Sequence, residues 1–271
     1  ILAGLLGTPF YALKALGPQA LSVCGAWLGA LLYALMLYFD FSGYSDMAIG
    51  LGRMLGFRFP ENFRYPYLCS SISDFWRRWH ISLGSWFKEY LYFPLGGSRA
   101  GTLRTLRNLL LVWLATGLWH GASWNYVLWG LYFGVLICLE KLLAPRFRAH
   151  PRKGLLAGLY RPVCLLLAVL GWVLFRAEDL PAAGRYFACL FGGAAGASAQ
   201  ARLYLHDFWP VLLLGAVGAT PLCAKLAGRL GAKLQPGVRA AVQAVLVLAL
   251  LACSTVWLLN GSFQSFVYFQ F

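Results

Sequence analysis

Three long stretches of this 271-residue chain carry no charged side chain, and they constrain its fold more than any other feature. Residues 15–39, 108–139 and 240–271 contain no Asp, Glu, Lys or Arg. A helix needs about 20 apolar residues to cross the hydrocarbon core of a bilayer, so each stretch is long enough. Only 12% of the residues are charged, about half the share typical of a soluble domain. The sequence predicts an all-α, polytopic bundle of transmembrane helices that forms one membrane domain over residues 1–271.

The net charge of +14 is explained by membrane topology better than by a nucleic-acid partner. Basic residues gather in a few loops, as the positive-inside rule for cytoplasmic loops expects. The seven cysteines are scattered, and most lie in apolar runs, where a thiol behaves as a small hydrophobic group. They form no C-x-x-C pair, so they predict neither a disulfide framework nor a metal site.

The segment 53–107 is strongly basic, with nine Lys or Arg against three acidic residues. It follows a predicted span over residues 15–39 that ends at Asp40. The stretch YFDFSGYSDMAIGLGRMLGF connects the two, and its glycines and small polar residues interrupt the helical apolar pattern. Pro60 and Pro66 break the chain further on. We expect this segment to be cytoplasmic and to form interfacial or re-entrant helices without a clean span.

The uncharged stretch 108–139 is typical of a helical hairpin. Both flanks are basic, which implies an even number of crossings, yet its 32 residues fall short of the roughly 40 that two full spans need. A turn from His120 to Ser123 that stops within the bilayer resolves this conflict. The first arm is about 18 Å long, against a hydrocarbon core of about 30 Å. We therefore expect His120 at membrane depth, and Gly130 and Gly134 to let two helices approach closely.

Further spans are predicted at 161–176, at 208–224 and in the tail from Ala240. The segment 176–207 between the first two has balanced charges, and we expect it on the outer side of the membrane.

His80 lies in the aromatic stretch SDFWRRWHISLGSWFKEYLYFPLGG. The helical spacing places Trp76, Trp79 and His80 on one apolar face of a single predicted helix. Two interpretations are open: a histidine at the entrance of a site, beside arginines that receive an anionic group, or an interfacial helix whose histidine bonds a backbone carbonyl. Arg77 and Arg78 could equally bind lipid head groups.

His120 is the stronger candidate, because an ionisable side chain at membrane depth is costly and marks a functional site by default. Desolvation disfavours imidazolium, so the ring should stay neutral and able to accept a proton. That property suits a general base acting on a hydroxyl; the alternative is a core histidine bonded to a neighbouring helix. No Cys, Asp or Glu stands at ligand spacing near either histidine, so no metal site is expected.

Asp40 and Asp46 flank the sequence FSGYS at a predicted membrane end. They could orient a catalytic histidine, or they could pair with Arg53 as structural ion pairs, and the second interpretation is favoured.

Several motifs taken together resemble the membrane-bound O-acyltransferase (MBOAT) family, in its branch that acts on bacterial polysaccharides. The matching stretches are YFDFSGYSDMAIGLGRMLGF, PENFRYPY, SDFWRRWHISLGSWFKEYLYFPLGG, GLWHGASWNYVLWG, LFRAEDL and VYFQF, in the family's order. Members of the family are longer at the N-terminus, and this chain begins with Ile and no signal-peptide pattern. We therefore expect it to be a C-terminal portion that lacks the N-terminal spans.

The resemblance implies a reaction and a site for it. It implies that His120, in G-L-W-H-G, is the catalytic histidine and that His80, in W-R-R-W-H, is the second active-site histidine. The other candidates are Arg77, Arg78, Trp79, Trp119 and Trp124 for substrate or donor binding, and Asp40, Asp46 and Asn125 in support. An acyl group, acetyl above all, would move from a cytoplasmic thioester, acyl-CoA or an acyl carrier, toward hydroxyls of an extracytoplasmic polysaccharide, with alginate favoured. No bound cofactor is expected.

The same resemblance implies a multi-pass protein of the bacterial inner membrane. Its expected partners are periplasmic acetyltransferase or accessory proteins, the polysaccharide acceptor and membrane lipids, but no nucleic acid. Three alternatives stay open: acylation of cellulose or peptidoglycan, D-alanylation of teichoic acid, and a non-enzymatic component for polymer export or scaffolding.

Overall fold

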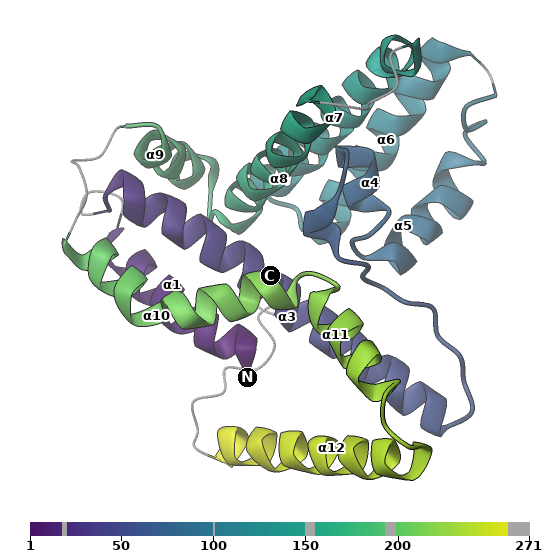
Figure 1. The fold of residues 1–271 in the computed structure, drawn as a ribbon. Coiled ribbons are helices and arrows are strands. Elements are labelled where there is room, and N and C mark those ends of the chain that lie inside the picture. The colour runs from purple at the N-terminus through teal and green to yellow at the C-terminus, as the bar shows by residue number, and fades with distance from the viewer. Residues whose placement is uncertain (18–20, 100, 150–154, 193–198, 260–271) are drawn as a thin grey trace.

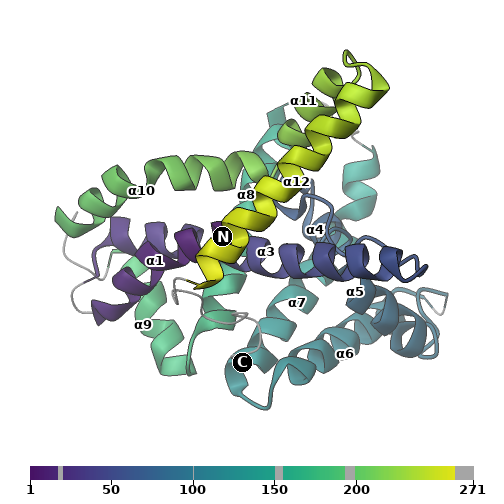
Figure 2. The same ribbon diagram turned by 90° about the horizontal axis from the view of Figure 1, so that it is seen from below.

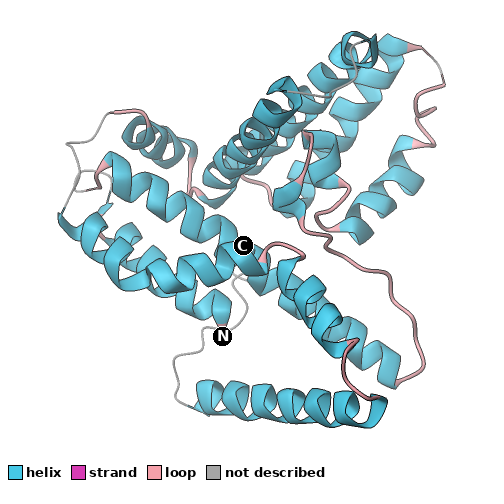
Figure 3. Ribbon diagram, in the orientation of Figure 1, coloured by secondary structure: helices cyan, strands magenta, loops and turns pink. Residues whose placement is uncertain are grey.

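The computed structural model describes residues 1–17, 21–99, 101–149, 155–192 and 199–259, with side chains throughout except at 144–149 and 155–157. Every regular element in these ranges is a helix, which confirms the predicted all-α fold (Figure 3). The α-helices are α1 (Leu2–Ala15), α3 (Val23–Met54), α4 (Ile72–Trp76), α5 (Ile81–Phe87), α6 (Thr102–His120), α7 (Trp124–Ala149), α8 (Leu155–Arg176), α9 (Leu180–Leu190), α10 (Ala199–Gly218), α11 (Leu222–Gly231) and α12 (Pro236–Leu259). A 3-10 turn, η1 (Pro66–Leu68), and a π-helix, η2 (Lys88–Tyr92), lie between them.

The helices pack as two groups that meet at α3. Helices α6, α7 and α8 lie side by side, with the short α4 against α7 and α8 (Figure 1). Helices α1, α9 and α10 pack on α3, and α3 also contacts α8. Helix α12 lies at the lower edge of Figure 1 and toward the viewer in Figure 2, and none of its residues is buried. Within the basic segment 53–107, η1 packs on α8, α4 packs on α7 and α8, and η2 packs on α6.

Four of the described helices are long and apolar enough to cross a membrane. They are α3, the Trp124–Leu143 part of α7, the Gly158–Arg176 part of α8, and α12. The predicted spans at 161–176 and in the tail are thus confirmed, and no helix of this kind lies in the described part of 53–107. Together these helices indicate a multi-pass membrane protein.

Helix α3 continues without a break from Val23 to Met54, so the prediction that it ends at Asp40 is wrong. One of its glycines, Gly52, and one of its small polar residues, Ser45, are packing positions instead. A Cβ at Gly52 would overlap the ring of Phe59, and the buried hydroxyl of Ser45 accepts a hydrogen bond from Asn62 (3.1 Å). A continuous helix satisfies its own backbone hydrogen bonds, which an interruption within an apolar environment would leave unpaired.

The predicted span at 208–224 is also wrong in its bounds. Helix α10 ends at Gly218, and α11 starts at Leu222, bent by 72° from it. Pro221 precedes α11, and proline has no backbone N–H with which to continue the hydrogen bonding of α10. The pair forms a broken span or a re-entrant loop by length and composition.

Helices α6 and α7 form the predicted hairpin, with its turn at residues 121–123. A Cβ at Gly130 would overlap the carbonyl oxygen of Trp113, and one at Gly134 would lie 2.9 Å from the Cβ of Trp113. The predicted close approach at these two glycines is confirmed. The depth of the turn within a bilayer stays a prediction.

Candidate active site

One cavity of about 630 Å³ lies between α4, α5, α6, α7 and α8, and both His80 and His120 line it. Five tryptophans form much of its apolar wall: Trp76, Trp79, Trp113, Trp129 and Trp172. The two histidines are forty residues apart in the sequence, His80 before α5 and His120 at the end of α6, so only the packing of α4 and α5 against the hairpin unites them. This cavity is the candidate active site.

Trp76 fixes α4 against the hairpin. Its ring centre lies 4.7 Å from that of Trp113, 4.8 Å from Phe133 and 5.5 Å from Trp129. Trp79 is buried and packs 4.7 Å from Trp172 on α8. Aromatic pairs at such distances each contribute roughly 0.5–1.5 kcal/mol beyond the area they bury. A five-residue helix is not stable by itself, so these contacts hold it in place.

His80 lies in a turn between α4 and α5, and the prediction of one continuous helix through Trp76, Trp79 and His80 is wrong. Its backbone is left-handed, with φ 46° and ψ 55°, which costs a non-glycine residue of order 1–3 kcal/mol and persists only when neighbours impose it. Asn62 imposes it here: its carbonyl accepts from Ile81 N (3.0 Å), and its Oδ1 accepts from Ser82 N (3.1 Å). The ring of His80 is thereby turned against Phe41, with centres 4.7 Å apart.

Burial lowers the pKa of His80 from 6.5 to about 4. At neutral pH this imidazole is therefore uncharged, and it can accept or donate a hydrogen bond inside the cavity.

His120 is the last residue of α6 and faces the start of α7 and the end of α8. Its ring centre lies 5.0 Å from those of Trp129 and Phe175, in edge-to-face contact. Gly121 follows it, and a Cβ there would lie 2.8 Å from the ring of Tyr126. The chain can make this turn directly after His120 because the next residue has no side chain.

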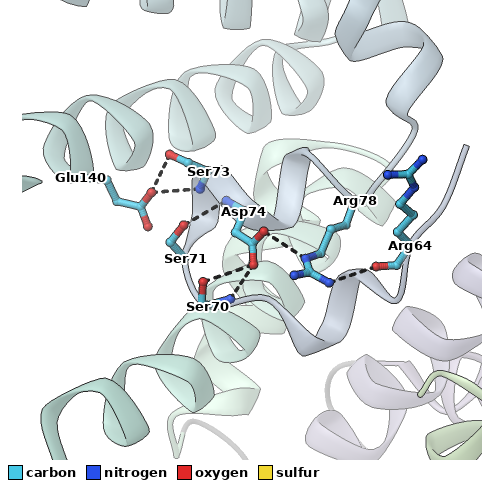
Figure 4. Close-up of polar contacts among 7 residues, drawn as sticks. All are labelled: Arg64, Ser70, Ser71, Ser73, Asp74, Arg78 and Glu140. Atoms are coloured by element: carbon cyan, nitrogen blue, oxygen red, sulfur yellow. Dashed lines mark hydrogen bonds and ion pairs between the residues drawn. The ribbon is translucent and has the colours of Figure 1, made fainter. Parts of the chain in front are cut away.

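The rim of the cavity is basic. Arg77, Lys88 and Lys141 line it from the end of α4, the start of η2 and the second half of α7. The sequence interpretation included Arg77 but missed the two lysines, which lie far from each other in the chain. Arg78 does not line the cavity: its Nε donates to Asp74 (3.0 Å) and its Nη1 to the carbonyl of Arg64 (3.3 Å; Figure 4). Of the two adjacent arginines, the structure brings only the first to the site.

Glu140 is the carboxylate in the cavity lining, and the sequence interpretation overlooked it. It lies on α7, and its two oxygens accept hydrogen bonds from the backbone of Ile72 (2.6 Å), the backbone and hydroxyl of Ser73 (2.9 and 2.6 Å), and the hydroxyl of Tyr160 (2.7 Å; Figure 4 shows the Ser73 bonds). The sequence did contain a signal for Glu140, because it is the first charged residue after a long uncharged stretch. An acidic side chain in an apolar helix usually has a hydrogen-bonding or charged partner.

The other predicted binding residues lie at different distances from the cavity. Trp79 lines it. Trp119 is half-exposed beside it, with its ring centre 4.8 Å from that of His120 and 6.2 Å from that of His80. Trp124 is 70% exposed at the start of α7 and does not line the cavity. Asn125 is buried, and its amide donates to the carbonyl of Ala177 (2.8 Å), which ties the start of α7 to the end of α8.

Asp40 and Asp46 both lie on α3, outside the cavity lining. The favoured pairing with Arg53 is wrong, because Arg53 pairs with Glu61 at 3.7 Å. Helix α3 continues past both aspartates, so Arg53 is carried beyond them to the loop that contains Glu61. Among the described residues, no group of three or more His, Cys, Asp or Glu is arranged to hold a metal ion.

The fold and site define a class of protein: a multi-pass helical membrane protein with two histidines in one aromatic-walled cavity. The sequence model of the MBOAT, or membrane-bound O-acyltransferase, family matches residues 6–171. The chain belongs to this family.

Similar proteins carry related names. Probable alginate O-acetylase AlgI of Pseudomonas fluorescens is 54% identical over 170 residues, which cover 61% of this chain and 33% of that protein. Peptidoglycan O-acetyltransferase of Helicobacter pylori is 45% identical over 166 residues, 60% of this chain and 31% of that protein. Teichoic acid D-alanyltransferase of Bacillus subtilis is 36% identical over 121 residues, 41% and 31% of the two chains. The chain spans about a third of the length of the curated relatives it matches.

Proposed function

We propose that this chain carries the active site of a membrane O-acyltransferase. The enzyme moves an acetyl group from a cytoplasmic thioester toward hydroxyls of an extracytoplasmic polysaccharide, and alginate is the polymer that the AlgI similarity favours. The observation that carries the proposal is the single cavity that His80 and His120 share.

In this proposal His120 is the general base. It takes the proton from the acceptor hydroxyl as the oxygen attacks the thioester carbonyl carbon. The carbon–sulfur bond then breaks, and the leaving thiolate receives the proton from the imidazolium. A positioned base of this kind contributes about 10² to 10⁴ in rate. His80, uncharged at neutral pH, and Trp79 would position the reacting groups.

The basic rim supports a donor that carries phosphate. Coenzyme A and the phosphopantetheine arm of an acyl carrier both join a thioester to phosphate groups, and both suit an entrance lined by Arg77, Lys88 and Lys141. The aromatic wall beyond the rim suits the uncharged pantetheine portion. No resident cofactor is needed for this reaction.

The remaining parts of the proposal rest on the family. The protein would lie in the bacterial inner membrane, with 53–107 on the cytoplasmic side and 176–207 outside. Periplasmic accessory proteins would complete transfer to the polymer.

The test is His120→Ala in the full-length protein, with polysaccharide O-acetylation measured at matched membrane abundance. We expect acetylation to fall at least a hundredfold. If the His120→Ala variant acetylates the polysaccharide at the wild-type level, His120 is not the general base. A matched control is His206→Ala, since His206 is 85% exposed on α10, where its ring contacts its neighbour Asp207.

Peptidoglycan is the second candidate acceptor, because the Helicobacter pylori relative is 45% identical over a similar length. Supplying alginate and peptidoglycan separately to the purified enzyme with its accessory proteins distinguishes the two.

A further inference from the structure

We infer that Glu140 is a positioning residue for the active site: it clamps α4 onto the hairpin and thereby sets where His80 lies in the cavity. The inference rests on the proposed function for its effect on catalysis, but the clamp itself can be tested without any activity.

The hydrogen bonds of Glu140 are directional and complete. One carboxylate oxygen accepts from Ile72 N and Tyr160 Oη, and the other from Ser73 N and Ser73 Oγ. The four donors come from two elements, α4 and α8, so one side chain of α7 joins three helices. Hydrogen bonds to a charged group are stronger than neutral ones. The backbone N–H groups of Ile72 and Ser73 lie in the first turn of α4, where they have no hydrogen-bond acceptor within the helix itself.

Helix α4 connects this clamp to His80. It has only five residues, and its far end leads through Arg77 and Trp79 to His80. A second set of bonds joins the same unit internally: Asp74 accepts from Ser70 and from Arg78, and Arg78 reaches the carbonyl of Arg64 (Figure 4). The unit is therefore stiff within itself, and its attachment to α7 goes through Glu140 and the ring of Trp76.

The clamp also fits the charge of the cavity. Arg77, Lys88 and Lys141 face an anionic donor, and a carboxylate in the same lining would weaken that attraction. The four donors on Glu140 offset its negative charge, so it can hold α4 without repelling the donor.

The first test is amide hydrogen exchange of the full-length protein in lipid nanodiscs, comparing wild type with Glu140→Gln. A glutamine cannot accept from both pairs of donors, because one oxygen becomes an amide N–H₂. We expect exchange over residues 72–80 to accelerate about tenfold to a hundredfold, while residues 128–136 of α7 stay unchanged. Ser73→Ala, which removes one hydroxyl and no backbone bond, should give a smaller acceleration in the same segment. Unchanged exchange over 72–80 in Glu140→Gln would overturn the clamp.

The second test measures acetyl transfer with saturating and limiting donor. We expect Glu140→Gln to lower kcat about tenfold with the donor KM changed less than twofold, and to lower kcat less than twofold when His80 is already Gln. Equal effects in the two backgrounds would show that Glu140 does not act through His80. Glu89→Gln, the same substitution at an exposed residue of η2, is the matched control and should behave as wild type in both tests. If the protein transfers no acetyl group at all, the proposed function fails, and the exchange experiment still decides the clamp.

Discussion

Gly130→Ala tests whether the close contact of α6 and α7 sets the position of His120. The added Cβ would overlap the carbonyl oxygen of Trp113 and would lie 3.1 Å from the Cα of Gly117. Ordinary contact distances are 3.5–4.0 Å between carbon atoms, so the helices must separate by roughly 1 Å. His120 ends α6, one turn beyond Gly117, and this separation shifts it relative to Trp129 on α7.

The effects on stability and on activity differ in size. Overpacking costs about 1–3 kcal/mol, and the higher helix propensity of alanine returns up to about 1 kcal/mol. We therefore expect the free energy of unfolding to fall by no more than about 3 kcal/mol. A misplacement of about 1 Å can cost a hundredfold in rate. Activity should thus fall far more than stability does.

The assay is the acetyl-transfer rate and the thermal midpoint of the full-length protein in nanodiscs. Gly184→Ala is the matched control, because Gly184 is exposed in the middle of α9 with no atom within 4 Å of an added Cβ. We expect this control to be fully active and equally or more stable. If Gly130→Ala is as active as the control, the hairpin contact does not position His120.

Three further predictions follow from the site. Because the pKa of His80 is lowered in the folded protein, the unfolded chain binds a proton at this residue between pH 6.5 and about pH 4 and the folded protein does not. The thermal midpoint should therefore fall as pH drops through this window, and it should fall less in His80→Gln. Arg77→Gln and Lys141→Gln should each raise the donor KM about threefold to tenfold with kcat little changed, and added salt should weaken donor binding in wild type more than in the double variant. Burial alone would raise the pKa of Asp74, but hydrogen bonds from Arg78 and Ser70 lower it overall. Asp74→Asn should therefore lower the unfolding free energy at pH 7 by about 1.5–3 kcal/mol, measured by denaturant titration. This difference between wild type and variant should shrink below pH 3.8, where the wild-type carboxyl is protonated.

The sequence by itself determined the class of fold, because a membrane helix satisfies its backbone within its own residues. Uncharged stretches long enough to span a bilayer predicted the first part of α3, α7 and α12, and the basic flanks with the glycines of 130–134 predicted the α6–α7 hairpin. The same local rules named both histidines as candidates. All of these features depend on residues close together in the chain.

Tertiary structure alone decided how the site is assembled, because its contacts join distant residues. Asn62 turns the chain at His80, so the regular spacing that predicted one helix gave the wrong element. Arg78 hydrogen-bonds to Asp74 and does not line the cavity, whereas Lys141 lines it from α7. Glu140 bonds residues 67 and 68 positions before it, which no local pattern indicates. The uncharged stretches therefore define a membrane protein, and the packing of a five-residue helix against the hairpin makes the cavity that both histidines share.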